Sequence, residues 1–85
     1  MNRQEVYEAI DSERDYQNQK WGSPNQRPKQ VGSWLTLMRA ILAKAEAEWA
    51  VSDGDNEALE IIRKFTAVGV ACMEQHGVQK RKASK

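Results

Sequence analysis

The segment SWLTLMRAILAKAEAEWA, residues 33–50, decides the fold, because its apolar residues recur at a helical spacing. At about 100° per residue, one broad side of a helix carries Trp34, Leu37, Met38, Ile41, Leu42, Ala45 and Trp49. Alanines occupy the opposite side, where small residues permit a second helix to approach closely. We therefore expect a helix over residues 34–51, capped by Ser33 and buried on two sides at the centre of a bundle.

One carboxylate interrupts this apolar pattern. Glu48 follows Ile41 by seven positions and so lies within the apolar arc of the helix. Lys44, at the margin of the arc, is four residues earlier and within reach of Glu48. A carboxylate among Trp, Leu and Ile is either tolerated by the fold or is a functional group, so Glu48 is a candidate site residue.

Two further helices are expected on either side of this segment. Residues 4–20 have a narrow apolar stripe, and residues 56–76 have a conventional apolar face between an Asp55 or Asn56 N-cap and a Gly77 C-cap. Prolines and glycines make residues 22–32 a long connection, which is either an ordinary crossover or a functional loop. No strand-like alternation is present, so the fold class is all-α.

The totals predict a single small domain. The chain has 85 residues, of which we assign 1–77 to one helical domain and 78–85 to a basic, disordered tail. Many chains this short gain stability by oligomerising, so we expect a homo-oligomer. The formal charge of +1 argues against a dedicated nucleic-acid binder.

The sequence also bears on the compartment. It has one cysteine, no signal-peptide pattern at its start, and no run near the ~18 apolar residues that cross a bilayer. We therefore expect a soluble, cytoplasmic protein with no membrane partner, in the host cytoplasm if the source is a virus.

Several catalytic patterns are excluded. The stretch DGDNEALE has its glycine at the wrong position for a calcium loop, and no glycine-rich phosphate loop is present. His76 is the one histidine and no nucleophile motif surrounds a serine, which argues against covalent catalysis. What remains is carboxylate chemistry on the helices at Glu46, Glu48, Glu57 and Glu60, although a Glu60–Lys64 ion pair explains Glu60 equally well.

Taken in order, SERDYQNQKWG, a proline-bearing loop, SWLTLMRAILAKAEAEWA and ALEIIRKFTAVGVACMEQHG resemble the small phage and bacterial MazG-like proteins. These belong to the all-α nucleoside triphosphate pyrophosphohydrolases, and the resemblance covers residues 13–77. It implies a helical bundle that forms dimers or tetramers. It also implies Mg²⁺-dependent hydrolysis of a nucleotide between its α- and β-phosphates, with release of pyrophosphate.

The resemblance implies a set of metal ligands in which this chain departs from the family pattern. The Glu-Glu-x-x-Glu set of the family falls on Lys44, Ala45 and Glu48, and the Glu-x-x-Asp set falls on Glu57 and Glu60. The implied Mg²⁺ ligands are therefore Glu48, Glu57 and Glu60. A lysine at position 44 adds positive charge where the cation would bind, and is suited to contact a phosphate directly.

The resemblance also implies a nucleotide site. Arg14, Gln17, Lys20 and Trp21 resemble the stretch that lies beside the nucleotide in the family. Trp21 and Trp34 are candidates to stack on a base, or else core anchors, while Arg14, Lys20 and Lys44 are candidates to contact phosphate.

Three functions follow from these residues. The first is a nucleoside triphosphate pyrophosphohydrolase, the second is a protein that binds or sequesters a nucleotide without cleaving it, and the third is a helical protein-interaction module.

Overall fold

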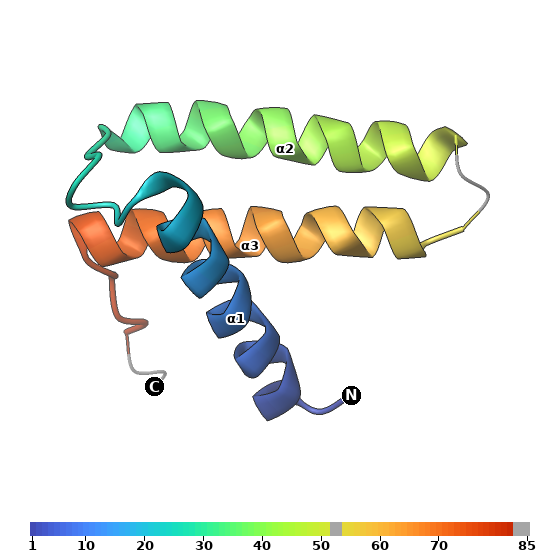
Figure 1. The fold of residues 1–85 in the computed structure, drawn as a ribbon, viewed down its shortest axis with the longest axis horizontal. Coiled ribbons are helices and arrows are strands. Elements are labelled where there is room, and N and C mark those ends of the chain that lie inside the picture. Colours follow the sequence, from blue (N-terminus) through green and yellow to red (C-terminus); the bar gives the residue numbers. More distant parts are fainter. Residues whose placement is uncertain (52–53, 83–85) are drawn as a thin grey trace.

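The computed structural model describes residues 1–51 and 54–82 and consists of three α-helices joined by irregular segments (Figure 1). The helices are α1 (Arg3–Trp21), α2 (Val31–Val51) and α3 (Asn56–His76), and the described residues include no strand. The all-α class and the three predicted helices are thus confirmed. The turn after α2 and the tail 78–85 each lie partly outside the described residues, and residues 78–82 are not helical.

The third helix, not the second, is central within the chain. In Figure 1, α2 and α3 lie side by side and antiparallel, while α1 crosses α3 at a steep angle. In the described residues α3 packs against both other helices, and α1 makes no comparable contact with α2. Within the single chain the central helix is therefore α3, and burial of α2 on two sides in a multi-chain bundle stays a prediction.

Small residues on α3 explain this arrangement. Ala67 is fully buried and Ala71 is 3% exposed. Ala67 lies one turn after Arg63 and two turns before Glu74, the two α3 residues that bind side chains of α1. A face without bulky side chains lets α1 cross close to the α3 backbone.

The core is small and lies between α2 and α3. Trp34, Val68 and Ala71 form its centre, and Met38, Ile41 and Cys72 pack against it. Other residues of the predicted apolar faces are exposed in the single chain, namely Leu37, Leu42 and Trp49 of α2 and Ile62 and Met73 of α3. The apolar arc of α2 is too wide for α3 alone to cover it.

The start of α2 differs from the prediction because the preceding loop is tied to α3. The Gln75 side chain accepts hydrogen bonds from the Lys29 backbone amide (3.1 Å) and from Trp34 Nε1 (2.9 Å), and donates one to the Lys29 carbonyl (2.7 Å). The next carbonyl, that of Gln30, accepts from the amides of Ser33 and Trp34. The helix therefore begins at Val31, and Ser33 lies inside its first turn instead of capping it.

The other helix ends follow known capping patterns. Asn2 and Glu5 form a capping box at the start of α1, which the sequence reading missed. Asp55 occupies the predicted N-cap position of α3, but its carboxylate accepts from Trp49 Nε1 (2.9 Å) instead of from the helix backbone. Gly77 ends α3 as predicted, with a φ of 92° that favours glycine.

None of the helices in the described residues combines the length and the apolar character needed to span a bilayer.

Gln75→Ala should lower the free energy of unfolding by about 1–2 kcal/mol, because it removes three hydrogen bonds that hold the loop and Trp34. Urea unfolding followed by circular dichroism measures this change. Gln79→Ala, which alters an exposed glutamine beyond the end of α3, is the matched control. Equal stabilities of the two variants would contradict the role assigned to Gln75.

Candidate functional site

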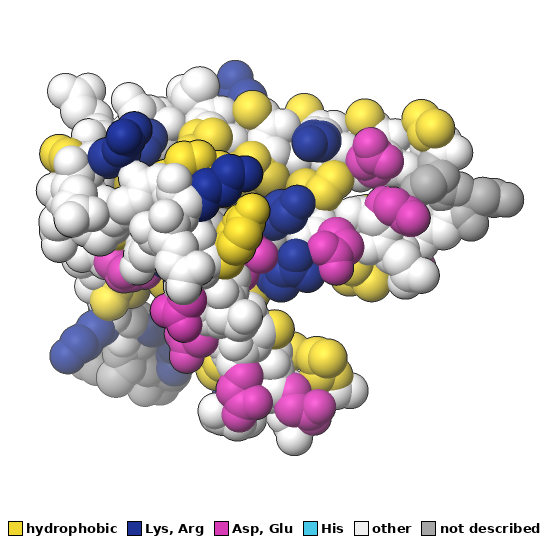
Figure 2. All heavy atoms as spheres, in the orientation of Figure 1, with side chains coloured by type: hydrophobic (Ala, Val, Ile, Leu, Met, Phe, Trp, Pro, Cys, Tyr) yellow, Lys and Arg dark blue, Asp and Glu magenta, His cyan; other side chains and the backbone are white. Residues whose placement is uncertain are grey.

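A cleft of about 540 Å³ lies between α1, α2 and the loop that joins them, with α3 as its floor. A volume of this size is typical of small-molecule sites. Its floor and walls include the apolar side chains of Leu37, Ile41, Ile61 and Val68. In Figure 2, side chains of lysine and arginine gather where α1 crosses α3 and along the adjoining part of α2. The cleft is therefore an apolar depression with a basic border.

The charges that line the cleft are mostly positive. Six basic side chains line it, from all three helices and the loop: Arg14, Lys20, Arg27, Lys29, Lys44 and Lys64. Among the described residues the lining includes one carboxylate, that of Glu13. A surplus of cations around an apolar cavity favours a ligand that carries negative charge.

Arg14 fixes α1 to α3 and is largely occupied by protein partners. It is 5% exposed, and its Nε and Nη2 atoms donate to the two carboxylate oxygens of Glu74. Its Nη1 donates to Gln17 Oε1 (3.0 Å), and its Nη2 also donates to Asn18 Oδ1 (2.8 Å). Arg14 and Gln17 line the cleft as the resemblance implied, but these contacts make them supports of its wall.

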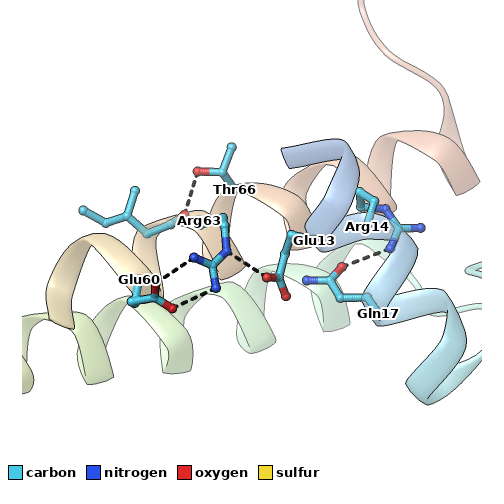
Figure 3. Close-up of polar contacts among 7 residues, drawn as sticks. Glu13, Arg14, Gln17, Glu60, Arg63 and Thr66 are labelled. Atoms are coloured by element: carbon cyan, nitrogen blue, oxygen red, sulfur yellow. Dashed lines mark hydrogen bonds and ion pairs between the residues drawn. The ribbon is translucent and has the colours of Figure 1, made fainter. Parts of the chain in front are cut away.

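Glu13 is held by a second ion pair between α1 and α3 (Figure 3). Arg63 Nε donates to Glu13 Oε1 at 2.9 Å, and the carboxylate of Glu13 is 7% exposed. The terminal nitrogens of the same guanidinium donate to both oxygens of Glu60, at 2.9 and 2.8 Å. The single acid in the cleft lining is thus committed to a structural contact.

This bridge shifts the titration of its members. The hydrogen bonds and the positive charge of Arg63 lower the pKa of Glu60, and the hydrogen bonds to Glu60 and Glu13 raise the pKa of Arg63. Because the folded pKa of Glu60 is depressed, the stabilisation from this pair is present above the ordinary glutamate pKa and is lost as the pH falls through the folded pKa. The predicted partner of Glu60 was Lys64, which contributes only a lesser electrostatic effect.

The aromatic residues of the cleft differ in exposure. Trp34 is 5% exposed, so of its two expected roles, base stacking or anchoring the core, the structure favours the core anchor. Lys29 Nζ lies 4.5 Å from its ring centroid. Trp21 is 53% exposed, with Lys20 Nζ 4.9 Å from its ring centroid and 5.8 Å from that of Tyr16. Trp21 and Tyr16 therefore offer accessible aromatic faces beside a cation.

Lys44 and Lys64 bring positive charge to the cleft from α2 and α3. Both side chains are exposed, and no ion pair between described residues includes either of them. The predicted pair of Lys44 with Glu48 is accordingly not among these ion pairs. Two lysines on the border of one cleft, neither ion-paired with a carboxylate of the described residues, can neutralise the phosphates of a ligand.

The structure does not assemble the implied magnesium ligands. Glu48 is half-buried on α2, Glu57 is exposed in the first turn of α3, and Glu60 is bound by Arg63. Within residues 1–51 and 54–82, no three or more Asp, Glu, His or Cys side chains are grouped so that they could hold a metal ion. Magnesium binding by Glu48, Glu57 and Glu60 stays a prediction without geometric support.

Several cleft residues were not identified from the sequence. Arg27 and Lys29 come from the proline-bearing loop, Lys64 from α3, and Glu13 and Tyr16 from α1. The only signal for Arg27 and Lys29 was positive charge in a long loop, and Lys64, Glu13 and Tyr16 had none, because the convergence of all five depends on how α1 crosses α3.

Comparisons with protein-family models, with curated proteins and with solved structures find no match to this chain. The geometry of the cleft is therefore the feature of the molecule that bears on its function.

Arg63→Met should lower the free energy of unfolding by about 1–3 kcal/mol, because it leaves the buried carboxylate of Glu13 without its partner. The double variant Glu13→Leu/Arg63→Met should recover most of this loss, since replacing both members removes the unpaired charge. Urea unfolding of both variants measures the difference. A double variant as unstable as the single one would show that the unpaired charge is not the cause.

Proposed function

We propose that this chain binds a nucleotide in the cleft between α1, α2 and α3. One observation carries the proposal: besides Arg14, which is bound by Glu74, five basic side chains of the cleft lining border an apolar cavity with exposed aromatic rings beside it. A nucleotide combines a flat ring that stacks on aromatic side chains with phosphates that bind cations, so it matches both parts of the cleft.

The two parts of the cleft suggest an orientation for the ligand. Trp34 and Lys44 are ten residues apart on α2, which separates them by about 15 Å along the helix axis. Trp34 and the loop residues mark one end of the cleft, and Lys44 marks the other. The base would stack near Trp21 and the phosphates would contact Lys44 and Lys64.

Binding is better supported than hydrolysis. The MazG-like resemblance implies that Mg²⁺ at Glu48, Glu57 and Glu60 would activate a water to split a triphosphate into monophosphate and pyrophosphate. Glu60 already binds Arg63 through both oxygens, and Lys44 stands where the family has a carboxylate. The cleft lining thus offers cations for phosphate and few oxygen ligands for a metal.

We also propose that the protein is a homo-oligomer, as the resemblance implies for a dimer or tetramer. Large apolar side chains remain exposed on one flank of the α2–α3 pair: Val31, Leu35, Leu42 and Trp49 from α2, and Leu59, Ile62 and Met73 from α3. Leu35 is about 160° around α2 from Leu37, which lines the cleft, so this apolar flank faces away from the cleft. A second copy that covers it would leave the cleft accessible.

Calorimetric titration with mono-, di- and triphosphates of the common nucleosides and with cyclic nucleotides tests the binding function. Lys44→Ala and Lys64→Ala should each weaken binding about tenfold, the loss expected for one charged hydrogen bond to phosphate.

Arg39→Ala is the matched control for these variants, because Arg39 is an exposed cation on α2 that does not line the cleft. Release of pyrophosphate from triphosphates with Mg²⁺ would establish the hydrolase instead. If the titrations detect no binding of any nucleotide, the remaining function is the helical protein-interaction module.

Sedimentation equilibrium tests the assembly. Leu42→Lys or Ile62→Lys should shift the protein from oligomer to monomer, because each buries a charge in the proposed interface. Val78→Lys, at a 63% exposed position beyond α3, should leave the mass of the assembly measured by sedimentation equilibrium unchanged. A wild-type protein that sediments as a monomer at all concentrations would refute the interface.

A further inference from the structure

We infer that the cleft takes the metal-free form of its phosphorylated ligand, so that Mg²⁺ competes with the protein for the phosphates instead of bridging them to it. This inference rests on the nucleotide-binding function proposed above. It concerns the ionic form in which the ligand is bound, a property that the cleft lining itself determines.

The first support is the identity of the charged groups. Magnesium in nucleotide sites is held by protein carboxylates together with the phosphates. Among described residues, the cleft lining has one carboxylate, Glu13, against six basic side chains. A divalent cation bound here would stand close to several positive charges and would be repelled by them.

The second support is that the carboxylate in the cleft lining, that of Glu13, already has a partner, which it shares with Glu60. Glu13 is 7% exposed and accepts from Arg63 Nε at 2.9 Å, and the same guanidinium binds both oxygens of Glu60 (Figure 3). A metal that recruited Glu13 or Glu60 would have to break a contact between α1 and α3. Arg63 therefore holds, as a fixed cation, the one carboxylate of the cleft lining and one of the three implied magnesium ligands, Glu60.

The third support is that the lysines can replace the metal. Lys44 and Lys64 line the cleft from facing helices and have no carboxylate partner among the described ion pairs. Their ammonium groups can neutralise phosphate oxygens directly. Chelation by Mg²⁺ lowers the negative charge of a triphosphate and covers the oxygens that these ammonium groups would contact.

Calorimetric titration with ATP, in EDTA and in Mg²⁺ in excess over ATP at matched ionic strength, tests the inference. The dissociation constant should be about tenfold lower in EDTA, because the more highly charged anion is attracted more strongly by Lys44 and Lys64. Binding that is tighter in Mg²⁺, or that occurs only in Mg²⁺, would overturn the inference and leave the binding function intact. If ATP binds in neither solution, the inference is refuted. ATP is then also excluded as a ligand of the proposed nucleotide site.

Lys44→Glu supplies a second, independent readout. It places a carboxylate at the position where the chain departs from the MazG-like pattern, on an exposed side chain of α2. ATP binding in EDTA should weaken more than tenfold, and adding Mg²⁺ should now strengthen it. Arg39→Glu makes the same charge reversal on α2 outside the cleft and should preserve the wild-type response to Mg²⁺. An unchanged response in Lys44→Glu would contradict the assigned role of this lysine.

Discussion

The attachment of α1 to α3 by charged side chains is the interaction on which the cleft depends. The residues of α1 that are buried are Glu13, Arg14 and Gln17, all of them polar. The helix is therefore held by the pairs Arg14–Glu74 and Glu13–Arg63 and not by an apolar stripe. Arg14 and Glu13 are the buried members of these pairs, and each needs a precisely placed partner, since the solvation that a buried charge loses is restored only by a well-placed opposite charge. This requirement fixes the angle at which α1 crosses α3, and that angle opens the space between α1 and α2.

The helices were predictable because they depend on local patterns. The apolar spacing between Trp34 and Trp49, the prolines of the loop and the glycine after His76 locate α2, the connection and the end of α3 from neighbouring residues alone. The start of α2 was misplaced because Gln75, more than 40 residues away, holds Lys29 and Trp34. No local signal indicates a contact of that range.

The site was predictable only in part for the same reason. Lys44 and Trp21 could be singled out, one by its departure from a family pattern and the other by its position before the loop. The roles of Arg14 and Glu13 could not, because a charged residue in a weakly amphipathic helix looks the same whether it binds a ligand or another helix. Arg63 is a charged residue outside the apolar face of its helix, and nothing in the residue spacing shows that α1 lies against it. The charges of the cleft converge through tertiary contacts that residue spacing does not encode.

The three tryptophans occupy three separate environments, which gives the protein three intrinsic optical probes. Trp34 is 5% exposed in the core, Trp21 is 53% exposed beside the cleft, and Trp49 is 61% exposed on the apolar flank of the α2–α3 pair. Indole emission depends on contact with water, so chains that retain one indole each would report separately on folding, on ligand capture and on assembly. For the same reason, the fluorescence spectrum of the unaltered protein is the sum of three indole emissions. A change in that spectrum can be assigned to one tryptophan only after the emission of each indole has been measured separately.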